Sequence, residues 1–385
     1  MGRHFLQIPG PTNCPDEVLA AIRQPTIDHR GPEFRAMACD LLESVKPVFG
    51  TNRPVVIYPS SGTGAWEAAL VNSLSPGDRV LFFETGHFSI LWRAMAERLG
   101  LVVEMVPGDW RSGVNPDDVS LRLEKDATHS IKAVCCVHNE TSTGVASRIP
   151  DIRAAIDSVG HPALFLVDTI SSLASMDYRH DEWGVDVTIC GSQKGLMLPP
   201  GLGFNVIGDK ALKALESATL PRSYWDWAPI LEENKKGSWP YTPSTNMLYG
   251  LKVAVEMLMS EGLPNVFARH HRHAAATRSA VQAWGLEVLC SDPREYSSTL
   301  TAVVVPDGFD ADKIRALILE RFDMSLGTGL SRLAGSVFRI GHLGHFNDLT
   351  LAGTLSGVQM GLELSGVPLT GDGVSAALQV LMKSA

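Results

Sequence analysis

Between residues 54 and 208, short apolar runs alternate with longer stretches in which apolar residues recur at helical spacing. The apolar runs predict seven strands, at 54–58, 79–83, 102–106, 132–138, 163–168, 187–190 and 202–208. The stretches between them predict helices, among them 65–74, 89–100 and 149–160. Strands that alternate with helices are typical of an α/β fold, in which a mostly parallel sheet carries helices on both faces.

The pattern changes in the last third of the chain, where long helical stretches accompany two further strands. The predicted elements are helices at 241–262, 263–286, 310–322 and 349–366 and strands at 300–306 and 337–343. This mixture predicts a smaller α+β domain of about 125 residues, which is a normal domain size. We therefore expect three parts: a segment over the active site at 1–20, a large domain at 21–260 and a small C-terminal domain at 261–385.

The composition narrows the class of protein. Hydrophobic residues make up 45% of the chain and charged residues only 19%, which is enough for a buried core and argues against disorder. The net charge of −9, without a run of lysines or arginines, argues against nucleic acid or an anionic membrane as a partner. No apolar stretch reaches the length of a membrane span, and the N-terminus has no signal-like apolar region, so we expect a cytoplasmic protein.

The cysteines and histidines do not form a recognisable metal site. The six cysteines contain no CxxC pair, and Cys135, Cys136 and Cys190 lie in apolar runs, which favours reduced core thiols over disulfides or metal ligands. The basic "RHHRH" at 269–273 lies in a helical pattern, and no HExxH spacing occurs.

One lysine stands out in "TICGSQKGLMLPP", residues 188–200. Lys194 directly follows an apolar strand, among small, apolar and turn-forming residues. A buried ammonium group is costly unless its charge is neutralised or used, so Lys194 is either a lysine on a solvated loop or a nucleophilic amine with a lowered pKa. Asp168 closes another apolar strand, in "ALFLVDTISS". Alone it could be a helix cap, but the carboxyl ends of the strands in an open α/β sheet are where ligands bind.

A lysine and a carboxylate in these positions suit pyridoxal 5′-phosphate. The lysine bonds the cofactor as a Schiff base, and the carboxylate keeps the pyridine nitrogen protonated. The phosphate needs donors, and "YPSSGTGAWEAAL" provides Ser61, Gly62 and Thr63 at a strand-to-helix turn. The turn is not a Walker A loop, because no Lys-Ser/Thr follows the glycines, and by itself it could serve only close packing. Gln193 offers a further phosphate donor.

Three segments resemble the class V aminotransferases among the fold type I pyridoxal phosphate enzymes. These are "HNETSTGV" at 138–145, "VDTISS" at 167–172 and "GSQKGLMLPPG" at 191–201. The likeness is greatest to the serine–glyoxylate and alanine–glyoxylate aminotransferases, and it extends from "PGPT" at 9–12 to "FRIGHLG" at 338–344. It implies a large domain with a mostly parallel central sheet and a smaller C-terminal α+β domain.

The resemblance also implies a role for each matching residue. Lys194 is expected to be the catalytic lysine and Asp168 the partner of the ring nitrogen. The cofactor contacts it implies are Ser61, Gly62, Thr63 and Gln193 for the phosphate, Thr141 for the ring hydroxyl, Phe88 and Ile170 for the two ring faces, and Thr242 of the neighbouring subunit for the phosphate. Trp239 stands where relatives often have a tyrosine or phenylalanine, and it has no hydroxyl to offer. Arg339 is expected to hold the substrate carboxylate with two parallel hydrogen bonds, and the backbone of "PGPTN", including Gly10, is expected to cover the substrate.

The predicted reaction is a ping-pong transfer of an amino group from serine, aspartate or alanine to glyoxylate or a similar small 2-oxo acid. Ser244, Thr245 and Asn246 make the segment near the presumed pocket polar, which favours serine or aspartate as donor. A cofactor site shared between subunits requires at least a homodimer.

Other functions remain as alternatives. A 2-aminoethylphosphonate-type aminotransferase, a lyase or a decarboxylase could use the same scaffold. A cysteine desulfurase is disfavoured because 322–338 contain no cysteine and Gln193 precedes the lysine. A non-catalytic dinucleotide- or ligand-binding protein would need a GxGxxG turn, and "SSGTGAW" lacks the third glycine.

Overall fold

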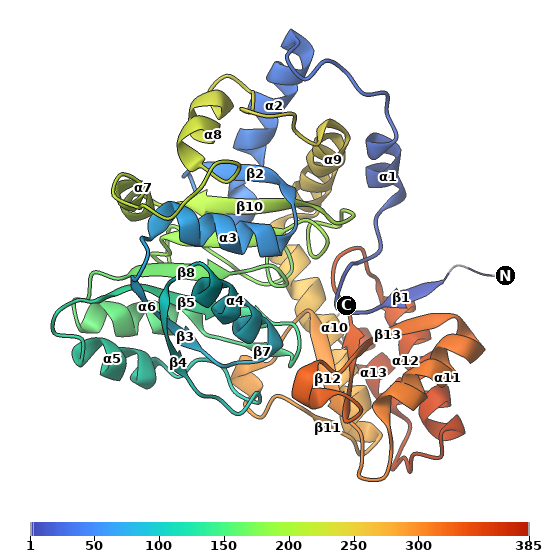
Figure 1. Cartoon of the computed structure of the whole chain (residues 1–385). Coiled ribbons are helices and arrows are strands. Elements are labelled where there is room, and N and C mark those ends of the chain that lie inside the picture. Colours follow the sequence, from blue (N-terminus) through green and yellow to red (C-terminus); the bar gives the residue numbers. More distant parts are fainter. Residues whose placement is uncertain (1, 3, 384–385) are drawn as a thin grey trace.

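The computed structural model describes residues 2 and 4–383 and contains two main sheets (Figure 1). The larger sheet has seven strands. They are β2 (Val55–Ser60), β3 (Arg79–Phe83), β4 (Val102–Val106), β5 (Ile131–Val137), β8 (Leu164–Asp168), β9 (Val187–Gly191) and β10 (Gly201–Ile207). All seven strands predicted from the apolar runs are therefore present.

The strand order in the large sheet is β2-β10-β9-β8-β5-β3-β4. Strands β9, β8, β5, β3 and β4 pair in parallel, and β10 pairs antiparallel with both β9 and β2. The sheet is thus mostly parallel, as predicted. Because the parallel strands end at one edge, the loops after β2, β3, β5, β8 and β9 gather there, at the position where open α/β sheets bind ligands.

Helices cover this sheet, and one continuous apolar core lies between them and the strands. The helices are α2 (Pro32–Ser44), α3 (Gly62–Ser73), α4 (His87–Arg98), α5 (Pro116–Glu124), α6 (Ile149–Ser158), α7 (Asp209–Leu215), α8 (Trp227–Asn234) and α9 (Thr245–Glu261). Helix α3 packs on β9 and β10, which places its N-terminus beside the loop that follows β9. The 3-10 helix η1 (Lys46–Phe49) follows α2.

The smaller sheet has five strands in the order β1-β13-β14-β12-β11 and a separate apolar core. Its strands are β1 (Phe5–Gln7), β11 (Glu287–Val288), β12 (Leu300–Val304), β13 (Met324–Thr328) and β14 (Val337–Gly341). Its helices are α10 (Leu263–Ala283), α11 (Ala311–Phe322), α12 (Asp348–Leu364) and α13 (Gly373–Lys383), with the 3-10 helices η2 (Pro293–Glu295) and η3 (Ser331–Leu333). Apart from β1, which is blue, these elements form the orange to red lobe in Figure 1.

The first residues of the chain belong to this smaller sheet, which the sequence did not predict. Strand β1 pairs in parallel with β13. The chain then crosses to the large sheet and enters α1 (Asp16–Ile22), which packs against α9. The domain boundaries at 20/21 and 260/261 stay predictions. Helices α9 and α10 meet at Gly262, two residues after the predicted boundary at 260/261.

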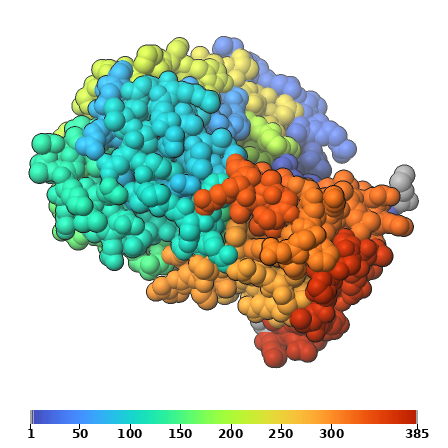
Figure 2. All heavy atoms as spheres, turned by 60° about the horizontal axis from the view of Figure 1, so that its bottom comes forward, coloured from blue at the N-terminus to red at the C-terminus, as the bar shows by residue number. Residues whose placement is uncertain are grey.

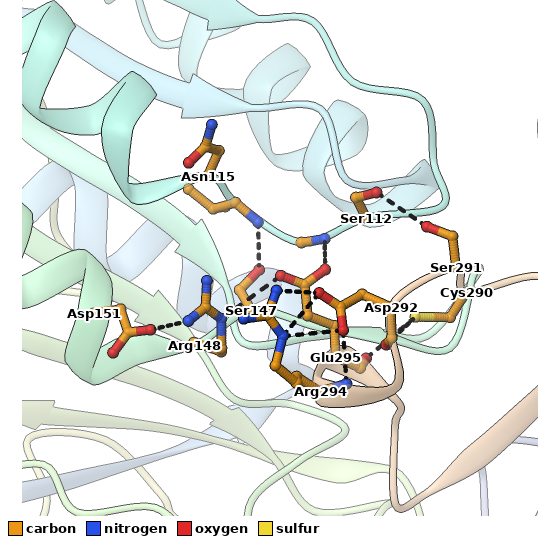
Figure 3. A network of polar contacts seen from close by, with 12 residues as sticks. Ser112, Asn115, Ser147, Arg148, Asp151, Cys290, Ser291, Asp292, Arg294 and Glu295 are labelled. Carbon is orange, nitrogen blue, oxygen red and sulfur yellow. Dashed lines mark hydrogen bonds and ion pairs between the residues drawn. The ribbon is translucent and has the colours of Figure 1, made fainter.

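The two lobes lie directly against each other in the space-filling view (Figure 2). A network of polar contacts joins the loop around 109–115 to the segment 290–295 (Figure 3). The carboxylate of Glu295, which is buried, accepts a hydrogen bond of 2.6 Å from the Gly113 N–H and lies 3.7 Å from Nε of Arg148. Closer to the strand ends, the Arg332 guanidinium lies over the Trp110 ring and 3.6 Å from Glu84.

The cysteines are free thiols, and Cys135, Cys136 and Cys190 are buried, as predicted. Within the described residues, no group of three or more His, Cys, Asp or Glu side chains is arranged to hold a metal ion. In the part of the chain that the structure describes, every helix is too short or too polar to span a bilayer.

Candidate active site

A cavity of about 230 Å³ opens at the carboxyl ends of the parallel strands. It is lined by Gly10, Gly62, Thr63, Trp66, Phe88, Val137, Asn139, Thr141, Asp168, Ile170, Gln193 and Lys194. These residues lie in the N-terminal segment, at the carboxyl ends of β5 and β8, in the segments that follow β5, β8 and β9, and near the N-termini of α3 and α4. The fold therefore brings together most of the residues singled out in the sequence, including Lys194 and Asp168.

A larger cavity, of about 540 Å³, lies between β1, the end of α9 and the loop after β14. Its charged side chains are already engaged: Arg269 pairs with Glu261 and also donates to the carbonyls of Gly344 and Phe346. No lysine or aspartate lines it. The smaller cavity is therefore the candidate active site.

Lys194 follows β9 by three residues and is buried at the floor of the cavity. Burial lowers the pKa of its amine to about 7, and the nearby Arg339 guanidinium acts in the same direction, while Asp168 opposes the shift. The amine donates a hydrogen bond to the carbonyl of Pro9. A lysine whose pKa is this low can lose its proton near neutral pH, which an ordinary surface lysine does not do.

Asp168 is the last residue of β8 and is 4% exposed. Its Oδ1 accepts a hydrogen bond of 2.7 Å from the Ile170 N–H, and its Oδ2 accepts one of 3.0 Å from Nε1 of Trp66. Burial raises the pKa of this carboxyl to about 7, against the effect of these two hydrogen bonds. Asp168 and Lys194 are thus two titratable groups in one cavity whose pKa values are shifted in opposite directions from their ordinary values.

The N-terminus of helix α3 opens into the other end of the cavity. Its N-cap residue, Ser61, makes no side-chain capping hydrogen bond, so the first N–H groups of the helix remain available to an anion. A Cβ on Gly62 would collide with Cδ1 and Cγ1 of Ile170, so any other residue here would displace that side chain. The buried Oε1 of Gln193 has no hydrogen-bond partner among the described residues. Ser61 itself is exposed and does not line the cavity.

A polar wall follows β5. The Thr141 hydroxyl donates to Oγ of Ser171 at 2.8 Å, and the Asn139 amide donates to Ser171 Oγ at 2.8 Å and to Thr299 Oγ1 at 2.9 Å. Oδ1 of Asn139 is buried and has no partner within the described chain. Asn139 is therefore a free acceptor on the cavity wall, a feature that the sequence analysis did not single out.

Phe88 lies in the first turn of α4, and a buried carboxylate fixes this turn. Glu140 accepts hydrogen bonds from the backbone N–H groups of Phe88 and Ser89, at 3.4 and 3.2 Å, and from the Ser142 hydroxyl at 2.6 Å. Its side chain is fully buried, and burial raises its pKa. Glu140 thus occupies the positive end of the helix and holds Phe88 at the cavity.

Arg339 lies on β14 and does not itself line the cavity, but it reaches the wall. Its Nη1 donates to the carbonyl of Thr141 at 2.6 Å and its Nε to the carbonyl of Thr328 at 2.8 Å. Burial lowers the pKa of the guanidinium to about 10, so it stays positively charged at neutral pH. Nη2 has no hydrogen-bond partner among the residues that the structure describes.

The segment 239–246 lies outside the cavity of its own chain. Thr242 is exposed. The indole of Trp239 is buried and donates to the carbonyl of Ile57 at 2.9 Å, which makes it a core residue. The Asn246 amide donates to the carbonyls of Ile22 and Gln24 and so holds the chain after α1. Within one chain, this segment therefore gives no support for a polar donor.

Comparison with known proteins finds relatives that match almost the whole chain. The sequence model of the Aminotransferase class-V family matches residues 4–339. Serine–glyoxylate aminotransferase from Arabidopsis thaliana is 47% identical over 380 residues, which cover 98% of this chain and 94% of the plant protein. L-aspartate–glyoxylate aminotransferase from Paracoccus denitrificans is 47% identical over 372 residues, 96% of this chain and 94% of the bacterial protein. The crystal structure of ureidoglycine–glyoxylate aminotransferase from Bacillus subtilis has a TM-score of 0.91 at 26% identity and covers 99% of both chains.

Proposed function

Because this chain belongs to the class V aminotransferase family, we propose that it transfers the amino group of a small L-amino acid to glyoxylate or a similar small 2-oxo acid. The donors we propose are serine, aspartate and alanine. Two relatives of equal identity, 47%, are named for serine and for aspartate, so overall similarity does not choose between these donors. The observation that carries the proposal is the pair Lys194 and Asp168, both buried in one cavity, with pKa values shifted in opposite directions.

The cofactor we propose is pyridoxal 5′-phosphate, and the cavity has features that fit it. The uncapped N-terminus of α3 suits a phosphate group, and the side-chain NH₂ of Gln193, which lines the cavity, would be a further donor. Phe88 and Ile170 line the cavity as apolar side chains that suit the two faces of a flat ring. The buried Asp168 suits a protonated ring nitrogen, and Thr141 suits the ring hydroxyl. When bound, this cofactor withdraws electrons from the α-carbon of an amino acid attached to it.

In the proposed mechanism, each of the chain's own groups has one task. Lys194, with its lowered pKa, removes the proton from the donor's α-carbon. It then returns the proton to the cofactor carbon that carries the transferred nitrogen. Asp168 holds a proton at the ring nitrogen. Arg339 binds the carboxylate that donor and acceptor have in common. Because both substrates need that arginine, they bind in turn, and ping-pong kinetics follow.

We further propose that the enzyme works as a homodimer. Thr242 is exposed on its own subunit, and the N-terminus of α3 and Ser61 are only partly covered. A second subunit that placed Thr242 beside this helix would complete the phosphate site. The Thr242→Ala variant is then expected to bind pyridoxal phosphate about tenfold more weakly, the loss of one hydrogen bond to a charged group. A fully active monomer by sedimentation would contradict the dimer.

The decisive experiment is to measure pyridoxal phosphate content and kcat/KM with serine, aspartate and alanine, with glyoxylate as acceptor. We expect a yellow protein that uses at least one of these donors. Lys194→Ala is expected to lose the absorbance of the lysine-bound cofactor and all turnover. A protein that binds pyridoxal phosphate but transaminates none of these donors would favour the alternatives, a lyase, a decarboxylase or a phosphonate aminotransferase. A colourless protein that takes up no pyridoxal phosphate would overturn the proposal.

A further inference from the structure

Two buried tryptophans lie side by side next to the cavity, but only one of them has a partner for its N–H group. Trp66 on α3 and Trp92 on α4 stack with ring centroids 5.9 Å apart and an interplanar angle of 12°. Nε1 of Trp66 donates to Asp168, whereas Nε1 of Trp92 has no hydrogen-bond partner in the described residues. The two indoles therefore share one environment but differ in one polar contact, the hydrogen bond from Trp66 to Asp168.

That contact bears on the carboxylate proposed to face the ring nitrogen. Asp168 receives one neutral donor on each oxygen, the Ile170 N–H at 2.7 Å and the Trp66 indole N–H at 3.0 Å. Two donors on two oxygens fix the rotation of the carboxylate. Both also favour its ionised form, because a protonated carboxyl would have to give up an acceptor site. Burial acts against ionisation, so these donors counter the shift of the pKa of Asp168 that burial causes.

The position of Trp66 on α3 links this contact to the other end of the cavity. Trp66 lies four residues after Gly62, one turn into the helix whose N-terminus faces the proposed phosphate site. Trp66 also lines the cavity itself. The same helix therefore sets both the anion-binding end of the cavity and the orientation of the carboxylate at its far end.

We propose that Trp66 is a positioning residue: its indole N–H fixes the carboxylate of Asp168 in the orientation and ionised state that hold a proton on the ring nitrogen of pyridoxal phosphate. This inference rests on the proposed function, since it assumes that the cavity binds this cofactor. It assigns Trp66 no contact with the reacting atoms. A role of this kind predicts an effect that depends on the ring nitrogen, which a purely structural role would not produce.

The test measures how strongly the cofactor-free protein prefers pyridoxal phosphate over its 1-deaza analogue, which lacks the ring nitrogen. Equilibrium dissociation constants for both compounds are measured with the wild type, Trp66→Phe and Trp92→Phe. Trp66→Phe is expected to reduce the preference about tenfold, the typical loss of one hydrogen bond to a charged group. Trp92→Phe, which removes the same ring area without a hydrogen bond, is expected to leave the ratio unchanged within about twofold. In an Asp168→Asn background, Trp66→Phe is expected to have no further effect on the ratio.

An unchanged ratio in Trp66→Phe, or equal losses in both tryptophan variants, would overturn the inference, because the indoles would then act through packing alone. If Trp66→Phe does not fold, Trp66 is replaced by 3-benzothienylalanine, which has sulfur in place of the N–H. This side chain keeps nearly the same volume and tests the same hydrogen bond. A wild type that binds neither compound refutes the proposed cofactor. A wild type that binds both equally refutes the role of Asp168. Both failures are thus distinguishable from a failure of Trp66 alone.

Discussion

At the scale of single residues, Gly10 lies against the side chain of Lys194. A Cβ on Gly10 would collide with the Cδ, Cε and Nζ atoms of Lys194, and the backbone there has a φ of +98°. The Lys194 amine also donates to the carbonyl of Pro9. The N-terminal segment therefore determines where this amine can lie, and no other residue type fits at position 10 without moving it.

Gly10→Ala is consequently expected to lower kcat/KM at least a hundredfold, since displacement of a catalytic group by about 1 Å has effects of that size. Gly308→Ala is the matched control, because Gly308 has a similar φ of +89° but nothing within 4 Å of its added Cβ. Both variants carry the same backbone strain, and only one collides with the lysine. Equal losses of activity in the two variants would refute this explanation.

The lowered pKa of Lys194 gives a second prediction at this scale. In the cofactor-free protein, the amine is expected to titrate near pH 7, mainly because of burial and then because of Arg339. Arg339→Gln removes a positive charge and is therefore expected to raise this pKa, so that less neutral amine is present at pH 7. The ¹³Cε chemical shift of Lys194, assigned by its loss in Lys194→Ala, reports the titration directly. A midpoint above pH 9 in the wild type would be incompatible with the buried setting.

The sequence predicts these reactive residues better than it predicts the residues that support them. Lys194 and Asp168 each directly follow or close an apolar strand, where a charged residue is conspicuous. Trp66 and Asn139 were missed because a tryptophan in an apolar helix resembles an ordinary core residue, and an asparagine after a strand resembles a turn. Asn246 seemed suited to a pocket, yet its amide is used by backbone carbonyls 222 and 224 residues earlier. Such long-range contacts leave no local pattern.

At the scale of elements, helix α4 shows how a buried charge can hold one end of the cavity in place. Its first turn has no side-chain cap of its own from residue 86, which is a glycine, and the carboxylate of Glu140 takes the N–H groups of Phe88 and Ser89 instead. Helix α4 therefore begins where Glu140, three residues after β5, presents an acceptor. Glu140 thereby also holds the backbone of Phe88 next to the segment that contains Thr141.

Replacement of Glu140 by glutamine is expected to destabilise the protein by about 1–3 kcal/mol, because an amide NH₂ then faces backbone donors in a buried place. The affinity for pyridoxal phosphate is expected to fall as well, because Phe88 loses its fixed position. Glu97→Gln on the same helix, an exposed residue paired with Arg93, is expected to change the free energy of unfolding by less than about 0.5 kcal/mol. Urea unfolding of both variants measures the difference. Equal stability of the two would show that Glu140 does not fix the helix.

The strands of the large sheet were predictable, whereas part of the smaller sheet was not. The former are buried on both faces and form continuous apolar runs. Strand β1 has three residues, and β13 reads Met-Ser-Leu-Gly-Thr, with neither an apolar run nor a clear alternation. Helices α1, α2, α5, α7, α8 and α13 were also not predicted. Their apolar faces are narrow or short, and packing against neighbours such as α9 and α10 stabilises them.

At the scale of the whole molecule, several polar contacts join the two lobes, and two of them differ clearly in burial. Glu295 is buried and accepts the Gly113 N–H beside Arg148 (Figure 3). Arg111 and Glu287 form an ion pair between the same two lobes at the surface. Arg339 comes from one lobe and Lys194 from the other. The geometry of the proposed active site therefore depends on the contacts between the lobes.

Glu295→Gln is expected to cost about 1–3 kcal/mol of unfolding free energy and to speed hydrogen exchange in residues 109–115 and 290–295. Glu287→Gln, which removes the exposed ion pair with Arg111, is expected to stay within about 0.5 kcal/mol of the wild type. Differential exchange in the two variants is the measurement. A larger effect of Glu287→Gln than of Glu295→Gln would show that the exposed ion pair, not the buried contact, holds the lobes together.

The pairing of β1 with β13 also has a consequence for the order of events during synthesis. His4 contacts Asp323, a residue 319 positions later. At about 5–20 residues per second, a ribosome needs roughly 16–64 s to make the intervening chain. Until β13 has been made, β1 and the adjoining Pro9, whose carbonyl accepts from the Lys194 amine, have no strand to pair with. The nascent chain can assemble its large sheet early, but the proposed active-site cavity is complete only after residues 324–328 have been made.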